Sequence, residues 1–395
     1  MSRADGRKPN TDVSGEGMVL LYLTACALND SVPDIGQLSE EEAEKIFKGA
    51  MRHSIISPVA CALEKGGYAG IPGEAADKFK KARYKAIRKT LLLDAERENI
   101  LAYMEEEGIR YMPLKGVFLQ DLYPEPGMRQ MTDNDILYDV SCRAKLRKYM
   151  EGIGFTCKKD MGGVHDAYFM EPVYNYEMHG RLFTEAAGNG VYDAYYKDIW
   201  DRAVPDEDKK YGYHLSDADF YVYMTAHAEK HYSGPGTGIR TLADFYVMNR
   251  IFRRMDRDYV DGELKKLGLS DFEERIRVLA FKILGEDGNK ESLTPDEEWM
   301  LERLLASGTY GNTETKVTAL MKKRGIEGRL TAGKRMTYLF RRLFPDQKTL
   351  APFYPAARFK VLIPVVWAFR IVRGLATKQG DIKSEIAVVR RRKKV

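Results

Sequence analysis

Hydrophobic positions in the first hundred residues repeat with the spacing of helices. From Glu74 onward, apolar side chains recur at intervals of three, four or seven residues, so they fall along one stripe of a helix. Gly108 follows three glutamates and predicts the end of that helix. Earlier in the chain, Ser39 and Glu42 have the spacing of a capping box. We therefore predict a helical N-terminal region.

From Ile109 the pattern changes to short apolar runs separated by turns. This alternation predicts strands at 109–114, 133–140, 155–159, 165–170 and 174–183, with short helices at 117–123 and 143–151. The last strands are joined by short turns, which favours antiparallel pairing. The predicted fold class is α+β, with a small mixed or antiparallel sheet flanked by N-terminal and C-terminal helical regions.

Beyond the predicted strands the apolar spacing becomes helical again, and Thr294 followed by Pro295 forms a helix-start pattern. These patterns divide the chain into five predicted parts. They are a flexible N-terminus at 1–14, a helical region at 15–108, an α+β core at 109–205, a helical domain closing the cleft at 206–330, and a basic, partly apolar C-terminal region with a flexible tail at 331–395.

Alternation also sorts the side chains within two predicted strands. Successive side chains of a strand point to opposite faces, so Asp133 and Asp135 share one face and the apolar residues after them share the other. In the last strand, Glu177 and His179 share a polar face, with Tyr176 on the opposite face. Three carboxylates are thus available on polar faces of the predicted sheet.

Carboxylates on neighbouring strands would repel one another unless a cation lay between them. Oxygen ligands of this kind suit Mg²⁺ or Mn²⁺, and two such ions can activate a hydroxyl and neutralise a leaving pyrophosphate. Lys115 and Gly116 add a second element. A glycine that opens a short helix lets backbone N–H groups approach phosphate oxygens, and the lysine supplies a cation. Phosphoryl chemistry is the natural use of such residues.

The order of these motifs resembles a known family. The segments Pro113–Gly116 (PLKG), Arg129–Ile136 (RQMTDNDI) and Tyr176–His179 (YEMH) are together similar to the uncharacterised nucleotidyltransferase family of the polymerase-β-like superfamily. The segments His227–His231 and Arg240–Asp244 are similar to a pattern in the helical part of the same family. The likeness therefore extends over much of the chain, and it implies that the region 109–205 is a nucleotidyltransferase core.

This resemblance implies a reaction and a set of site residues. The implied reaction is metal-dependent transfer of a nucleoside monophosphate from an NTP to a small molecule, sugar phosphate, protein or RNA acceptor. Catalysis and binding of Mg²⁺ (or Mn²⁺) would fall to Asp133, Asp135 and Glu177. The predicted nucleotide-binding residues are Lys115, Gly116, Arg129, His179, His227 and His231. The chain departs from the superfamily in its Lys-Gly turn, which replaces Gly-Gly or Gly-Ser.

Several residues leave alternatives open. Arg129 either meets a phosphate or pairs with Asp121 or Glu125, and Arg240 with Asp244 forms either a substrate contact or an intrahelical ion pair.

The function has alternatives too. The same fold would serve a non-catalytic nucleotide-binding or partner-docking protein. His227 and His231 have the spacing of a zinc-binding helix face and would support a zinc-dependent hydrolase. Alternatively, they line the cleft between domains or form local hydrogen bonds.

Charge and composition indicate where in the cell the protein acts. From Arg329 to the C-terminus there are 17 Lys and Arg against 3 Asp and Glu, whereas the rest of the chain is net acidic. The basic end would allow a weak contact with an anionic surface, although we favour its apolar residues packing on the protein's own body. Four scattered cysteines, no signal-peptide pattern and no transmembrane-length apolar run predict a cytoplasmic protein, at most peripheral to a membrane.

Overall fold

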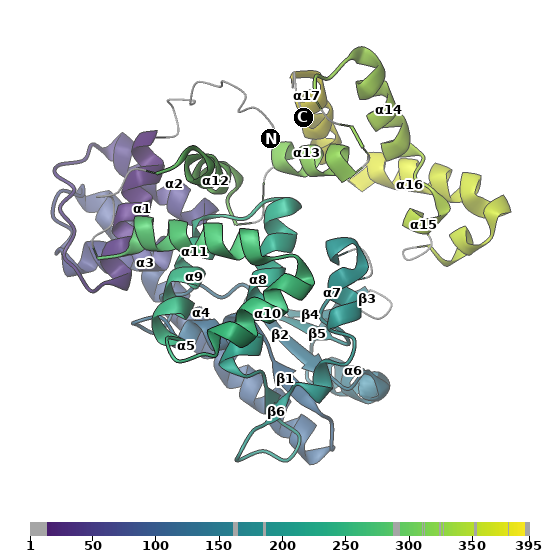
Figure 1. Cartoon of the computed structure of the whole chain (residues 1–395), viewed down its shortest axis with the longest axis horizontal. Coiled ribbons are helices and arrows are strands. Elements are labelled where there is room, and N and C mark those ends of the chain that lie inside the picture. Colours follow the sequence, from purple (N-terminus) through teal and green to yellow (C-terminus); the bar gives the residue numbers. More distant parts are fainter. Residues whose placement is uncertain are drawn as a thin grey trace. The chain divides into compact units, whose positions relative to one another are not determined.

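The computed structural model divides the chain into two compact units, residues 1–229 with 237–309 and residues 230–236 with 310–395 (Figure 1). The described residues are 14–160, 165–184, 187–286, 293–309, 311, 313–323, 325–326, 328–350, 354–377 and 379–391. The predicted flexible N-terminus lies outside them except for Ser14, which begins the first helix. The finer division into five parts stays a prediction.

Four helices precede the sheet, which agrees with the predicted helical N-terminal region. They are α1 (Ser14–Leu28), α2 (Glu40–Arg52), α3 (Ile56–Lys65) and α4 (Gly73–Glu106). The capping box at the start of α2 is present, because the Ser39 and Glu42 side chains each accept a hydrogen bond from the other's backbone N–H. Gly108 follows α4 with a φ of 69°, a left-handed conformation that glycine adopts without strain.

The sheet contains five strands in the order β1-β2-β5-β4-β3, and it is mixed. Strands β2 and β5 are parallel, while the other neighbouring pairs are antiparallel. The fold is therefore α+β with a small mixed sheet, within the predicted class. The strands are β1 (Tyr111–Pro113), β2 (Asn134–Tyr138), β3 (Thr156–Asp160), β4 (His165–Met170) and β5 (Tyr174–His179), with α5 (Gly116–Asp121) and α6 (Arg143–Gly152) between them.

One face of the sheet is apolar and packs against α4 and α6. Ile136, Tyr138, Tyr176 and Met178 all belong to this buried core, as alternation predicted. The hydroxyl of Tyr176 donates to the backbone oxygen of Leu93 on α4, at 2.7 Å. The polar residues of β2 and β5 are consequently directed to the opposite face.

Val140 departs from the prediction that it shares this apolar face. It lies beyond the end of β2 in a short 3₁₀ turn and is 47% exposed. The Asp139 side chain accepts a hydrogen bond from the Ser141 backbone and starts that turn.

A bundle of helices follows the sheet. It consists of α7 (Val191–Tyr195), α8 (Asp217–Ser233), α9 (Ile239–Ile251), α10 (Arg257–Leu267), α11 (Ser270–Leu284) and α12 (Pro295–Ser307), after the short strands β6 (Val204–Pro205) and β7 (Tyr213–His214). The predicted start at Thr294 and Pro295 is confirmed by a complete capping box with Glu297.

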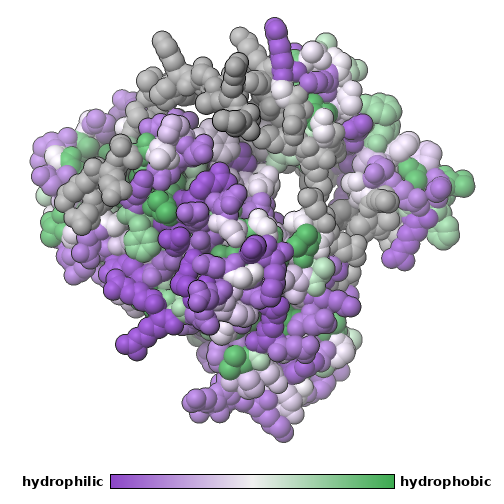
Figure 2. Space-filling view, viewed as in Figure 1, coloured by the Kyte–Doolittle hydropathy of each residue, from purple (hydrophilic) through white to green (hydrophobic). Residues whose placement is uncertain are grey.

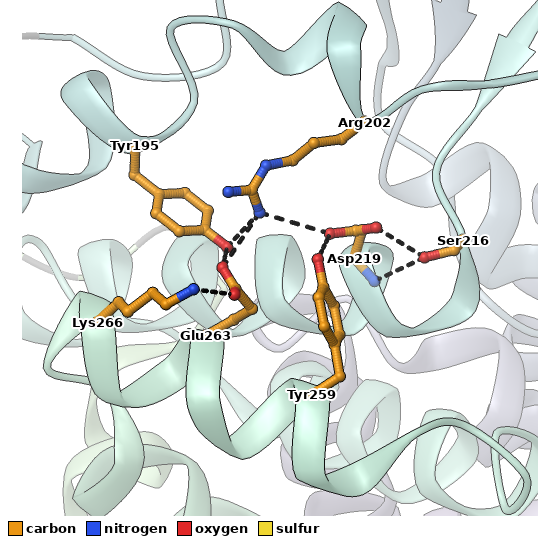
Figure 3. A network of polar contacts seen from close by, with 7 residues as sticks. All are labelled: Tyr195, Arg202, Ser216, Asp219, Tyr259, Glu263 and Lys266. Carbon is orange, nitrogen blue, oxygen red and sulfur yellow. Dashed lines mark hydrogen bonds and ion pairs between the residues drawn. The ribbon is translucent and has the colours of Figure 1, made fainter.

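A polar network joins α7, α8 and α10 (Figure 3). Arg202 contacts the buried Glu263 of α10 at 3.2 Å and Asp219 of α8 at 3.7 Å. Its guanidinium also lies 4.2 Å from the ring centroid of Tyr195, and Tyr259 donates to Asp219 at 2.7 Å. These contacts attach the segment that follows the sheet to the helical bundle.

The second unit holds the C-terminal helices α13 (Thr313–Lys323), α14 (Ala332–Leu343), α15 (Gln347–Leu350), α16 (Ile363–Thr377) and α17 (Gln379–Arg391). Tyr338 and Arg342 of α14 contact Glu385 of α17 at 2.6 and 2.9 Å. These contacts join α14 to α17.

Apolar side chains of this unit are unusually exposed, and green patches gather over its helices in Figure 2. Phe340, Phe359, Val361 and Phe369 are 55–87% exposed, and packing of this region on the protein's own body stays a prediction. Contact with an anionic surface stays a prediction. Within the described residues, no helix combines the length and hydrophobicity needed to cross a bilayer.

His53 makes the stability of the first unit depend on pH. Its side chain is fully buried, and Nδ1 accepts a hydrogen bond from the backbone N–H of Ile239 at 3.2 Å. Burial, with a smaller effect of Arg52, lowers the pKa of His53 to about 4. The unfolded chain takes up this proton near its ordinary pKa of about 6.5, so stability falls as the pH drops from about 6.5 toward 4.

We expect His53 alone to lower the free energy of unfolding by about 2 kcal/mol between pH 7 and pH 5. Urea unfolding at the two pH values measures this difference. In the His53→Asn variant the side-chain oxygen still accepts a hydrogen bond but does not titrate, so its pH dependence should be smaller by that amount. An equal pH dependence in both proteins would contradict the assignment.

Candidate functional site

The turn between β1 and α5 places Lys115 at the edge of the polar face. Lys115 has φ 49° and ψ −109°, a backbone conformation that is rare for a side-chain-bearing residue and costs roughly 1–3 kcal/mol. Gly116 opens α5, and a Cβ atom there would lie 2.7 Å from Arg129 Nη1 and from Met131 Sδ. A side chain at this position would displace Arg129 or Met131, whereas the backbone strain of the turn falls on Lys115.

Lys115 and His179 converge on one carboxylate. Lys115 Nζ lies 2.6 Å and His179 Nε2 lies 2.8 Å from the same oxygen, Oδ1 of the buried Asp135. Burial alone would raise the pKa of Asp135, but Lys115 and then His179 hold it well below the usual range for a carboxyl. Burial alone would lower the pKa of Lys115, but Asp135 raises it. Asp135 is therefore an anion held between two donors.

The register of the parallel strands places Glu177 beside Asp135. These two residues are partners across β2 and β5, so the sequence prediction that they lie on polar faces of neighbouring strands agrees with the structure. His179 Nε2 is 3.6 Å from Glu177 Oε2. Burial would raise the pKa of Glu177, but the contact with His179 and the nearby His165 lower it below its ordinary value.

His165 is a member of this site that sequence reasoning missed. It is the first residue of β4 and pairs with His179 of β5 in the antiparallel register. Its Nε2 lies 3.7 Å from Glu177 Oε2, and the two imidazole rings have centroids 5.0 Å apart. Alternation along β4 places His165 on one face of its strand, but only the pairing register shows that Glu177 lies on the same face.

Asp133 lies one residue before β2 and is partly buried. Its Oδ1 accepts a hydrogen bond from Thr132 Oγ1 at 3.0 Å. Burial raises the pKa of Asp133, Asp135 raises it further and Lys115 lowers it. Asp133, Asp135 and Glu177 thus influence one another electrostatically, and their joint binding of a metal stays a prediction.

Two cations beside Asp133 were not assigned to nucleotide binding from the sequence. Lys89 of α4 donates to the Thr132 backbone oxygen at 3.2 Å, and burial lowers its pKa while Asp133 raises it. Arg240 of α9 donates to the Gln130 backbone oxygen at 3.4 Å and lowers the pKa of Asp133. Together with Lys115, they contribute positive charge near Asp133. Lys89 lies on α4, and the sequence pattern of that helix revealed only its apolar stripe, so Lys89 was not identified.

Helix α8 adds Tyr223 to the surroundings of the site. The side chain is fully buried, and its hydroxyl has no hydrogen-bond partner among the described residues. Burial raises the pKa of Tyr223, Lys115 lowers it, and Asp135 and Glu177 raise it. A polar hydroxyl thus lies near the same three charged groups.

Arg129 does not pair with either of the partners predicted for it. Its Nε and Nη2 donate to the two carboxylate oxygens of Asp244 at 2.8 and 3.1 Å, and Tyr123 donates to Asp244 Oδ1 at 2.7 Å. The predicted partners Asp121 and Glu125 are wrong, because α9 packs Asp244 against the buried guanidinium. Its role as a nucleotide ligand stays a prediction.

The intrahelical ion pair considered for Arg240 and Asp244 is likewise wrong. Asp244 is held by Arg129 and Tyr123, while Arg240 donates to the Gln130 backbone oxygen. Arg240 and Asp244 therefore have different partners.

His227 and His231 lie on α8, as the helical spacing predicted. The ring of His227 is 6.3 Å from that of Tyr223, centroid to centroid. Within the described part of the chain, one group of three metal-ligand side chains has its ligand atoms within 4.8 Å of one another: His165, Glu177 and His179. The zinc site considered for His227 and His231 stays a prediction.

The sequence of the chain matches a known protein family. The model of a family described as an uncharacterised nucleotidyltransferase matches residues 39–285, a segment that includes the whole sheet and the helices α8 to α11. No curated protein and no solved structure matches the chain.

Proposed function

The chain belongs to the uncharacterised nucleotidyltransferase family, and from this premise we propose that it transfers a nucleoside monophosphate from an NTP to an acceptor hydroxyl. One observation carries the proposal. Lys115 and His179 contact the same oxygen of Asp135, in register with Glu177 on the neighbouring strand. Acidic and basic groups on one face are what a metal-bound polyphosphate requires.

The carboxylates of this face fit a divalent metal. Asp133 is destabilised as an anion by burial and by Asp135 and Glu177, a cost that a bound cation would remove. Both donors to Asp135 occupy Oδ1, so Oδ2 keeps its lone pairs within the described structure. We assign Asp133, Asp135 and Glu177 to Mg²⁺ or Mn²⁺, which favour such oxygen ligands. A bound metal would neutralise charge on the transferring phosphoryl group and on pyrophosphate.

The chain's own side chains would position the substrate and move the proton. Lys115, Lys89 and Arg240 supply positive charge for the triphosphate. As the acceptor oxygen bonds to the α-phosphorus, the bond from that phosphorus to the bridging oxygen of pyrophosphate breaks, and pyrophosphate leaves with the electron pair beside these cations. The acceptor proton passes to a carboxylate oxygen of Glu177, whose position His179 maintains.

Calorimetric titration tests the nucleotide site directly. We expect at least one of the four NTPs to bind only when Mg²⁺ or Mn²⁺ is present, and we expect the Asp133→Ala, Asp135→Ala double variant to lose that binding. Asp139→Asn is a matched control, because Asp139 directly follows β2 but pairs with Arg110 on the protein surface. This variant should bind like the native chain.

Two outcomes would redirect the proposal. Metal-independent binding that the double variant keeps would place the nucleotide elsewhere. Metal-dependent binding without pyrophosphate release in the presence of acceptors would favour the non-catalytic nucleotide-binding alternative.

A further inference from the structure

We propose that His165, Glu177 and His179 together form a nitrogen-containing metal centre that binds a first-row transition ion, from Mn²⁺ to Zn²⁺, in preference to Mg²⁺. The inference deepens the proposed function and rests on it for the role of the site, but the centre itself is argued from its own geometry. It makes the two metal positions chemically different, one with oxygen ligands from Asp133 and Asp135 and one with two imidazoles and a carboxylate.

The three ligand atoms are already grouped. Glu177 Oε2 lies 3.7 Å from His165 Nε2 and 3.6 Å from His179 Nε2, and the three ligand atoms all lie within 4.8 Å of one another. Bonds of about 2.0–2.2 Å to a common ion place its ligands about 3.0–3.6 Å apart. The two contacts to Glu177 are thus close to ligand spacing, and a small approach of the two rings would complete the centre.

The pairing of the strands accounts for this grouping. His165 is opposite His179, and Glu177 is opposite Ala167, so all three ligands lie on one face of the β4–β5 hairpin. A site built on paired strands holds its ligands more rigidly than one built on loops. The sheet therefore prepares the ligand set before any ion arrives.

Buried nitrogens without partners point to a ligand at this place. Among the described residues, neither ring nitrogen of His165 has a hydrogen-bond partner, and neither does Nδ1 of His179. The His179 side chain is 5% exposed. Buried polar atoms that stay unpaired are costly, so a histidine with both nitrogens unpaired is poorly explained as a structural residue. A metal ion would use an unpaired lone pair of His165, and His179 Nε2 would exchange its proton and its hydrogen bond to Asp135 Oδ1 for the ion.

The donor set decides which ions bind. Mg²⁺ takes oxygen ligands and keeps several waters, whereas imidazole favours transition ions. Two histidines with one carboxylate is a set that occurs with Zn²⁺ and with non-haem Fe²⁺. A site for Mg²⁺ alone would gain nothing from His165, and the carboxylates of the sheet would be sufficient.

Pulsed electron paramagnetic resonance on the chelator-treated full chain, loaded with Mn²⁺ alone, tests the centre. We expect nitrogen couplings from directly bound imidazole. The affinity for Co²⁺, followed through its absorption bands, should fall at least about a hundredfold in His165→Gln, because loss of a supporting second-shell group alone costs about 10- to 100-fold. His214→Gln is the control, since His214 pairs with Asp206 on the β6–β7 ribbon.

The outcomes separate this inference from the proposed function. Absence of nitrogen couplings, or equal Co²⁺ affinity in native chain and His165→Gln, would overturn the centre. If Mg²⁺-dependent NTP binding persisted in that case, the proposed function would stand without it. Nitrogen couplings that survive His165→Gln and disappear in His227→Gln would place the ion on α8 and overturn the proposal.

Discussion

Replacement of Asp135 by asparagine is expected to lower kcat/KM for metal-dependent pyrophosphate release at least about a thousandfold, or ~4 kcal/mol of transition-state stabilisation. The substitution removes a carboxylate that we assign to the metal and that orients Lys115 and His179 through Oδ1. Steady-state pyrophosphate release with the preferred NTP and acceptor measures the effect. Asp139→Asn, at the end of the same strand, should keep the native rate.

Folding has to be separated from chemistry in this experiment, because Asp135→Asn leaves the buried Lys115 without its counter-charge. Glu177→Gln avoids that problem, since it keeps the Lys115–Asp135 pair intact. We expect it to unfold at nearly the native urea concentration and still to lose most of the activity. Native activity in folded Asp135→Asn and folded Glu177→Gln would show that the reaction centre lies elsewhere.

The second large effect is on stability. Asp244→Ala is expected to lower the free energy of unfolding by about 3–5 kcal/mol, because it leaves the buried Arg129 guanidinium unpaired. Urea unfolding measures this change. The Arg129→Met, Asp244→Leu double variant should recover much of the loss, since it removes both buried charges at similar volume. Glu151→Gln breaks an exposed pair with Arg147 and should change the free energy by less than about 1 kcal/mol.

The same double variant decides what Arg129 does. If Arg129 positions the segment before β2 by holding Asp244 on α9, the folded double variant should bind NTP within a few-fold of the native affinity. A folded double variant that loses NTP binding would instead make Arg129 a nucleotide ligand, as the sequence motif alone predicts. We expect the double variant to keep its NTP affinity, because Arg129 Nε and Nη2 already donate to Asp244.

Local patterns in the sequence predicted much of this fold. The capping boxes of α2 and α12 and the glycine after α4 depend on residues within a few positions of one another. Alternation separated Asp135 and Glu177 from Ile136 and Tyr176, because a strand's two faces follow directly from its period of two. These features can be predicted from the sequence without knowledge of tertiary contacts.

Other features depend on which segments meet, and local patterns do not contain that information. The parallel pairing of β2 with β5 follows from the meander of β3, β4 and β5, and it sets Glu177 beside Asp135. The additions of His165, Lys89 and Tyr223 to the site come from three different elements. Asp244 is 115 residues from Arg129, so sequence spacing favoured the nearer but incorrect partners.

A crystal structure of the full chain with Mn²⁺ and an NTP analogue whose α,β-bridge cannot be cleaved tests the central claim most directly. The account predicts anomalous Mn²⁺ peaks about 2.0–2.6 Å from carboxylate oxygens of Asp133, Asp135 or Glu177, with the triphosphate beside Lys115. A well-ordered nucleotide bound away from this face, or Mn²⁺ bound only by His227 and His231, would contradict it.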